Sequence, residues 1–185
     1  MSNGNQCRNS TQTQSTQEGF TSMIFVTVGS QKFQFNRLLK KIDDLLQKGI
    51  IKDEVFAQIG VSDYKPKNYQ CADFTTRDEF NAKLNACDLL ITHGGTGVIV
   101  SALKLGKKVI AVPRLKKYGE HVDDHQIQLI DQFKELNLIE PAYSTSDLPS
   151  ALQNARTKTY APYISNTKNI IISIEQYIEQ PRGNK

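Results

Sequence analysis

From Met23 onward, short apolar runs alternate with longer segments in which apolar residues recur at helical spacing. Such short, continuous runs are typical of strands buried on both faces. They stand at 24–28, 55–59, 89–92 and 109–112, and a further short strand is expected near 69–71. The helical pattern predicts helices over 37–47, 76–86, 98–105, 123–136, 147–155 and 166–180. This alternation predicts βαβ units, and therefore an α/β protein built on a parallel sheet.

The first 22 residues differ from the rest, because they are rich in Ser, Thr, Gln and Asn and carry few large apolar side chains. Such a segment buries too little surface to offset the entropy of ordering it. We therefore expect a disordered leader over 1–22, a folded domain over 23–180 and a short tail over 181–185. Met23 lies where the ordered pattern begins and is an alternative start of the chain.

Composition narrows the class of protein. The chain has 185 residues, which suits one domain, and 23 basic against 19 acidic side chains give a net charge of +4. That excess fits an anionic small ligand but is too small for a nucleic-acid-binding protein. The three cysteines form no CxxC pair, so we expect neither a disulfide framework nor a zinc ribbon, and a reducing, cytoplasmic setting. No apolar stretch approaches the ~18 residues of a membrane span.

Glycines cluster directly after the run at 89–92, in the segment His93-Gly94-Gly95-Thr96-Gly97. Ligands of parallel sheets bind where strands end at their carboxyl edge. There, glycines let the backbone approach a ligand, and the N-terminus of the following helix favours a phosphate. The segment is not a Walker A motif, and Val100 stands where a GxGxxG motif would have its third glycine. The alternative is a tight turn with Thr96 as helix N-cap.

Two other loops follow strands at the same edge. Gly29-Ser30-Gln31 offers hydroxyl and backbone donors to a phosphate, or is a plain turn capped by Ser30. The segment 113–126 gathers polar groups that suit sugar hydroxyls and a diphosphate, although Asp123 and Gln126 also have the spacing of a capping box. His121 and His125 have the spacing of metal ligands, but no third ligand is obvious, so we predict no metal site.

Together these segments resemble the C-terminal domain of family 28 glycosyltransferases. More narrowly, they resemble the small donor-binding subunits of two-chain glycosyltransferases. The resemblance is carried by residues 27–30, 92–97, 102–114 and 118–126. One branch of these subunits is the eukaryotic dolichol-linked N-acetylglucosaminyltransferase. The segment 118–126 is most similar to the other branch, the bacterial capsule and exopolysaccharide pairs, which include β-1,4-galactosyltransferases.

The resemblance implies a single Rossmann-like domain equivalent to the C-terminal half of a GT-B glycosyltransferase. Such enzymes use a UDP-sugar, invert the anomeric centre and need no metal or other cofactor. A GT-B site is a cleft between two Rossmann-like domains, and this chain has room for one. The acceptor domain is therefore expected on a membrane-anchored partner subunit that presents a lipid-linked saccharide. That partner would hold this cytoplasmic chain at the inner face of the membrane.

By position, the resemblance assigns contacts with the donor. The diphosphate is expected at Gly29, Ser30, Gln31, His93, Gly94, Gly95, Thr96 and Gly97. The sugar and nucleotide are expected at Ser101, Pro113, Arg114, Glu120, His121, Asp124, His125 and Gln126. Ser101 departs from many relatives, which carry Glu or Asp there to bind ribose. No catalytic residue is assigned, because the sequence places neither Glu120 nor His93 near an acceptor.

The expected function is that of the UDP-sugar-binding catalytic subunit of a two-component inverting glycosyltransferase. It would transfer a hexose, with UDP-galactose favoured, to a lipid-linked saccharide in surface polysaccharide synthesis. One alternative is a non-catalytic nucleotide-sugar-binding or stimulatory subunit. A module for NAD or FMN is disfavoured by the incomplete glycine fingerprint. A UDP-sugar epimerase of related fold is disfavoured by the chain length.

Overall fold

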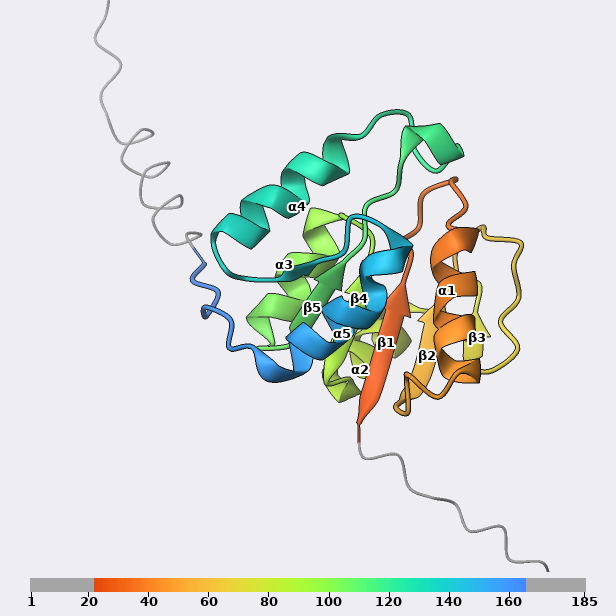
Figure 1. Cartoon of the computed structure of the whole chain (residues 1–185), viewed down its shortest axis with the longest axis horizontal. Coiled ribbons are helices and arrows are strands. Elements are labelled where there is room, and N and C mark those ends of the chain that lie inside the picture. Colours follow the sequence, from red (N-terminus) through yellow and green to blue (C-terminus); the bar gives the residue numbers. More distant parts are fainter. Residues whose placement is uncertain (1–21, 166–185) are drawn as a thin grey trace, which may run out of the picture.

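The computed structural model of the chain describes residues 22–165. Within them, a six-stranded sheet has the order β3-β2-β1-β4-β5-β6, and neighbouring strands are all parallel (Figure 1). The strands are β1 (Met23–Thr27), β2 (Glu54–Gln58), β3 (Gln70–Ala72), β4 (Leu89–Thr92), β5 (Lys108–Ala111) and β6 (Glu140–Pro141). The order reverses between β1 and β4, which opens a crevice at the carboxyl ends of these two strands.

Helices cover both faces of the sheet (Figure 1). They are α1 (Asn36–Gln47), α2 (Arg77–Ala86), α3 (Thr96–Lys104), α4 (His125–Glu135) and α5 (Leu148–Thr157), with short 3₁₀ turns η1 (Lys116–Tyr118) and η2 (Thr145–Asp147). Side chains of β1 alternate between two cores, since Ile24 and Val26 pack with α1 and α5, whereas Phe25 packs with α2, α3 and α4. Both faces are apolar because both are covered, which explains the continuous apolar runs in the sequence.

The α/β fold with a parallel sheet is confirmed, and each predicted strand lies within one residue of an observed one. β6 was not predicted, because its two residues give no pattern. The predicted helix over 76–86 is confirmed as α2, which begins with a capping box: the Thr76 hydroxyl accepts from the Glu79 N–H at 3.2 Å, and the Glu79 carboxylate accepts from the Thr76 N–H at 2.8 Å.

Two helix caps that the sequence offered as alternatives are absent. Ser30 caps no helix, because α1 begins only after Phe35, whose buried N–H donates to the Ser62 hydroxyl at 3.0 Å. Thr96 is the first residue of α3, and Gly95 occupies the N-cap position. The predicted leader, the tail and the helix over 166–180 lie outside the described residues and stay predictions. No helix within 22–165 is both long and apolar enough to cross a membrane.

A buried carboxylate ties the crossover between β2 and β3 to α1. Asp43 is 4% exposed. It accepts hydrogen bonds from the Tyr64 hydroxyl at 2.6 Å and from the N–H groups of Lys67 and Asn68 at 2.9 and 2.8 Å. Burial alone would raise the pKa of Asp43, but these hydrogen bonds outweigh burial and leave the pKa lowered. The ionised carboxylate therefore stabilises the folded state.

We expect Asp43→Asn to lower the free energy of unfolding by about 1–3 kcal/mol, because an amide cannot accept all of these bonds. Asp44→Asn is the matched control, since Asp44 is an exposed neighbour paired with Lys48, and its effect should stay within about 0.5 kcal/mol. Urea denaturation at several pH values measures both. Because the folded-state pKa is lowered, the Asp43 contribution is present above the unfolded-state pKa of about 3.9 and fades in acid. A gap between the wild type and Asp43→Asn that persists at low pH would contradict this account.

Candidate functional site

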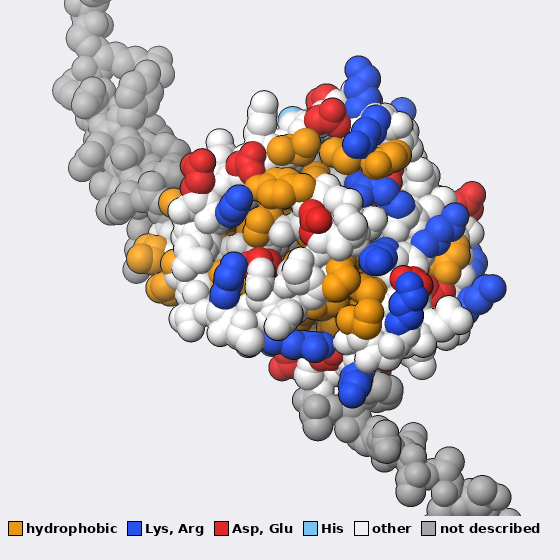
Figure 2. Space-filling model, viewed as in Figure 1, with side chains coloured by type: hydrophobic (Ala, Val, Ile, Leu, Met, Phe, Trp, Pro, Cys, Tyr) orange, Lys and Arg blue, Asp and Glu red, His pale blue; other side chains and the backbone are white. Residues whose placement is uncertain are grey.

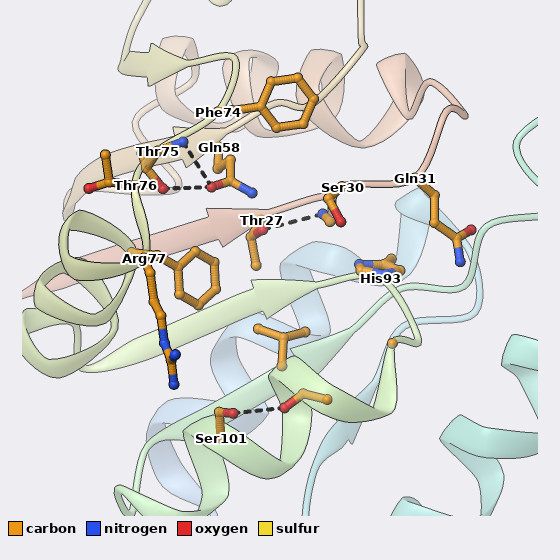
Figure 3. Close-up of a pocket in the computed structure, with 15 residues that line it drawn as sticks. Thr27, Ser30, Gln31, Gln58, Phe74, Thr75, Thr76, Arg77, His93 and Ser101 are labelled. Atoms are coloured by element: carbon orange, nitrogen blue, oxygen red, sulfur yellow. Dashed lines mark hydrogen bonds between the residues drawn. The ribbon is translucent and has the colours of Figure 1, made fainter.

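A cavity of about 510 Å³ lies at the carboxyl ends of β1, β2 and β4, where the strand order reverses (Figure 3). The loop after β1 borders it with Gly29, Ser30 and Gln31. The start of α3 borders it with Gly95 and Gly97, and the segment 74–77 after β3 completes the wall. The cavity thus joins two of the three loops that the sequence singled out.

His93 fills the space between the two glycine loops. Its side chain is buried, with 8% of the residue exposed. A Cβ atom added to Gly29 would lie 2.5 Å from the ring carbon Cε1, and one added to Gly95 would lie 2.5 Å from Nε2. Gly29 also has a φ of +79°, which disfavours any side chain. The imidazole therefore requires glycine at both positions.

The imidazole of His93 is neutral in the folded protein. Burial, assisted by the positive charge of Arg114, lowers the pKa of His93 to about 4. The ring can therefore exchange hydrogen bonds but brings no charge to the cavity at neutral pH. Its Nδ1 lies 3.4 Å from the Thr92 hydroxyl, which itself donates to the Thr27 carbonyl at 3.0 Å.

Gln126 connects the glycine loop to the loop after β5. A Cβ atom on Gly94 would lie 2.8 Å from the Cβ atom of Gln126, so the start of α4 packs directly on that glycine. The Gln126 side-chain carbonyl accepts from the Arg114 N–H at 2.9 Å. The predicted capping box of Asp123 with Gln126 was therefore wrong: Asp124 is the N-cap of α4, and no side chain caps the helix there.

Arg114 and Glu120 form a buried support beneath the loop after β1. The Arg114 guanidinium is fully buried and donates from Nη2 to the carbonyls of Val28 and Phe33. Glu120 accepts from Arg37 Nε at 2.8 Å and from the Leu115 N–H at 3.1 Å. Burial raises the pKa of Glu120 against the effect of these donors. Both side chains form hydrogen bonds within the protein, and neither lines the cavity.

The predicted site residues therefore fall into two groups. Those that line the cavity are Gly29, Ser30, Gln31, His93, Gly95, Gly97 and Ser101. Those outside its lining are Gly94, Thr96, Pro113, Arg114, Glu120, His121, Asp124, His125 and Gln126. Ligand contacts of both groups stay predictions, and the second group is placed to support the first or to face a ligand that extends beyond the cavity.

Sequence reasoning missed part of the wall. Gln58 ends β2, and Phe74, Thr75 and Arg77 follow β3, and all of them line the cavity (Figure 3). The Gln58 side-chain carbonyl accepts from the Thr75 hydroxyl at 2.6 Å, which fixes this segment to the sheet. The sequence did contain a signal for these residues, because the strand expected near 69–71 ends at the same edge of the sheet as the other strands. For the residues that follow it, the sequence analysis predicts only the helix over 76–86.

Comparison with known proteins identifies the family. The chain matches the glycosyltransferase family 28 C-terminal domain over residues 23–180. It belongs to this family. Among solved structures, the glycosyltransferase of kitacinnamycin aligns with a TM-score of 0.58 at 16% identity, over 76% of this chain and 36% of that protein. The solution structure of ALG13 aligns with a TM-score of 0.54 at 19% identity, over 83% of this chain and 94% of that one. The fold is thus that of the C-terminal half of a GT-B enzyme.

The curated relatives that this chain matches are named as subunits of UDP-N-acetylglucosamine transferases. The UDP-N-acetylglucosamine transferase subunit ALG13 of Candida albicans is 30% identical over 95 residues, which is 51% of this chain and 31% of the relative. The protein of the same name from Kluyveromyces lactis is 34% identical over 86 residues, which is 46% of this chain and 41% of that relative. The family 28 chain described here thus matches less than half the length of either relative. The expected bacterial capsule branch and its galactosyltransferases find no support in these relatives.

A pair of glycine substitutions tests whether His93 requires the glycine at position 95. We expect Gly95→Ala to lower the free energy of unfolding by about 1–3 kcal/mol, because its methyl group would meet the buried His93 ring. Gly97→Ala is the matched control two residues further on, in the first turn of α3, since nothing lies within 4 Å of its added Cβ. That change should be neutral or stabilise by up to about 1 kcal/mol. Equal losses for both variants in urea denaturation would show that His93 does not set the requirement.

His93 should also make stability depend on pH. Its folded-state pKa of about 4 lies below the unfolded value of about 6.5, so the unfolded chain binds more protons between these limits. The contribution of His93 is therefore complete above pH 6.5 and is lost as pH falls toward 4. We expect His93→Gln to have a flatter stability profile than the wild type over this window. Parallel profiles, or an NMR titration of the His93 ring near pH 6.5, would contradict its buried, neutral state.

Proposed function

We propose that this chain binds the UDP-sugar donor of a two-chain glycosyltransferase, with UDP-N-acetylglucosamine as the donor. The observation that carries the proposal is the cavity at the reversal of the strand order, formed by two glycine-containing loops in a family 28 C-terminal domain. Support for the donor comes from the curated relatives, which are named as subunits of UDP-N-acetylglucosamine transferases. UDP-galactose, expected from the sequence, becomes the second candidate.

The start of α3 suits the diphosphate. The N–H groups in the first turn of a helix have no intrahelical acceptor, and here Gly97 and Val98 lie in the cavity wall. The loop after β1 adds the Ser30 hydroxyl on the other side. Arg77 brings a positive charge to the lining, whereas His93 brings none. Oriented backbone donors and one guanidinium would together hold the diphosphate.

The opposite wall suits the nucleoside. Phe74 is 52% exposed and presents an aromatic surface on which a base can stack. Gln58 and Thr75 hydrogen-bond to each other at the same wall and offer polar groups beside it. The Ser101 hydroxyl lies across the cavity, where it donates to the Gly97 carbonyl at 2.9 Å and keeps a lone pair for a ribose hydroxyl.

This arrangement suits the transfer of the sugar from UDP to an acceptor hydroxyl. An acceptor hydroxyl attacks the anomeric carbon, the bond to the diphosphate oxygen breaks, and UDP leaves with the negative charge. Preorganised N–H groups at the start of α3 would stabilise that charge as it develops. The acceptor hydroxyl and the general base would come from a membrane-anchored partner that carries a lipid-linked saccharide and holds this chain at the cytoplasmic face. A non-catalytic donor-binding subunit is the alternative, because the described residues supply only one half of a GT-B cleft.

Ligand binding tests the proposal directly. A calorimetric titration series without divalent metal would compare UDP-N-acetylglucosamine, UDP-galactose, UDP-glucose, GDP-mannose, NAD and FMN. We expect UDP compounds to bind, with UDP-N-acetylglucosamine the tightest. Phe74→Ala should weaken UDP binding about tenfold, since stacking on an aromatic ring contributes about 1–3 kcal/mol. Leu136→Ala, which changes a more exposed apolar residue outside the cavity, should leave UDP binding unchanged.

If NAD or FMN bound and the UDP compounds did not, the proposal of a UDP-sugar site would be rejected. Gly95→Val should abolish UDP binding and, with the partner subunit present, transfer from radiolabelled donor to lipid acceptor. Donor binding without transfer in the assembled complex would favour the non-catalytic alternative.

A further inference from the structure

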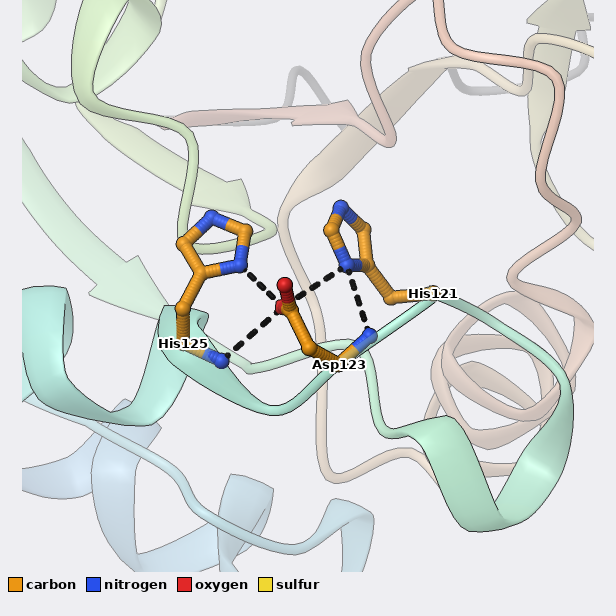
Figure 4. A group of neighbouring side chains, drawn as sticks. All are labelled: His121, Asp123 and His125. Atoms are coloured by element: carbon orange, nitrogen blue, oxygen red, sulfur yellow. Dashed lines mark hydrogen bonds and ion pairs between the residues drawn. The ribbon is translucent and has the colours of Figure 1, made fainter.

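Two histidines and an aspartate converge on the loop that enters α4. His121, Asp123 and His125 alternate along this loop, so their side chains project to the same side (Figure 4). None of them lines the 510 Å³ cavity. Their grouping therefore calls for an explanation other than contact with a ligand in that cavity.

The three side chains bring two ring nitrogens and a carboxylate oxygen close together. His121 Nδ1 lies 3.1 Å from Asp123 Oδ1, and His125 Nδ1 contacts the same oxygen. One ligand atom from each residue can be chosen so that all lie within 4.8 Å of one another. Two ligand atoms of tetrahedral zinc are separated by roughly 3.3 Å, given bond lengths of about 2.0–2.1 Å. Small side-chain rotations would bring the cluster to that geometry.

The Asp123 carboxylate joins the two imidazoles. The Nδ1 atoms of His121 and His125 both contact Asp123 Oδ1, and the Asp123 N–H lies 3.4 Å from His121 Nδ1. Within residues 22–165, Asp123 makes no ion pair with a lysine or arginine, and its recorded ion-pair partners are these two histidines. In the neutral tautomer that leaves Nδ1 unprotonated, each ring offers that nitrogen to a metal ion beside the carboxylate.

Of the three side chains, one is packed inside the protein and two are accessible to solvent. The His121 side chain is 7% exposed, and its ring packs on Phe33 with centroids 5.3 Å apart. The ring of His125 meets it edge to face at 4.8 Å. Asp123 and His125 are about half exposed, so an ion could enter from solvent. One fixed imidazole beside two reachable ligands is a partly preorganised site.

We propose that His121, Asp123 and His125 bind a divalent zinc ion. Two imidazoles and one carboxylate are a ligand set that zinc uses with water in the fourth position. Bound zinc would fix the loop after β5 to the start of α4 and, through His121 and Phe33, would brace the loop after β1. Asp123 supplies the third ligand that the sequence analysis lacked, because that residue had been assigned to a helix cap. The proposal does not depend on the cavity, and it gives His121 and His125 a role other than the donor contact expected from the sequence.

Adjacent aspartates give a matched test. Asp123 faces both imidazoles, whereas the Asp124 carboxylate accepts from the Lys116 N–H at 2.8 Å. Zinc would be titrated into chelator-treated protein, with a chromophoric chelator as competitor. We expect one equivalent to bind the wild type and Asp124→Asn alike. Asp123→Asn and His125→Gln should each weaken binding at least tenfold, with circular dichroism confirming that they fold.

Spectroscopy identifies the ligands independently. Cobalt loaded in place of zinc should give visible absorption bands in the wild type that disappear in His125→Gln. Zinc should also shift the NMR signals of the His121 and His125 rings and leave those of His93 in place. Absence of stoichiometric zinc binding, or binding of equal strength in Asp123→Asn, would overturn the proposal. The latter result would locate zinc elsewhere, for example at Cys71, and Cys71→Ser would confirm that.

Discussion

The buried imidazole of His93 sets the spacing between the two loops on which the candidate site depends. It lies between Gly29 and Gly95, and either glycine would need to move to carry a side chain. The first loop follows β1 and the second follows β4, so the ring acts where the strand order reverses. A flat, neutral side chain therefore separates the two backbone segments that border the cavity.

Support for that arrangement comes from a second row of polar residues further from the cavity. Arg114 donates to carbonyls in the loop after β1, and Gln126 accepts from the Arg114 backbone while packing on Gly94. These contacts connect the loops after β1, β4 and β5 through buried groups. Because buried hydrogen bonds are costly to leave unmade, the three loops should move as a unit rather than separately.

Regular patterns made the sheet predictable. Continuous apolar runs predict strands covered on both faces, and the capping box of Thr76 and Glu79 marks the start of α2. The start of α1 was predicted within one residue. β6 was not predicted, because its two residues give no pattern. The path of the chain before α1 was not predicted either, because it depends on tertiary contacts such as the bond from Phe35 to Ser62. Within the site, glycines and histidines were found by their type. The roles of Gln126 and Asp123 were not, because side-chain direction at the entrance to a helix depends on packing that spacing does not reveal.

The edges of the sheet carry a further consequence. β3 spans Gln70–Ala72 at one edge, and β6 spans Glu140–Pro141 at the other. A foreign strand needs a row of free backbone groups to dock upon, and these edges are short, with a proline in β6 that has no N–H to donate. Within the described residues, sheet extension is therefore a poor route to assembly. We expect contacts made by this part of the chain to use side chains and loops, where the identity of each residue can select the partner.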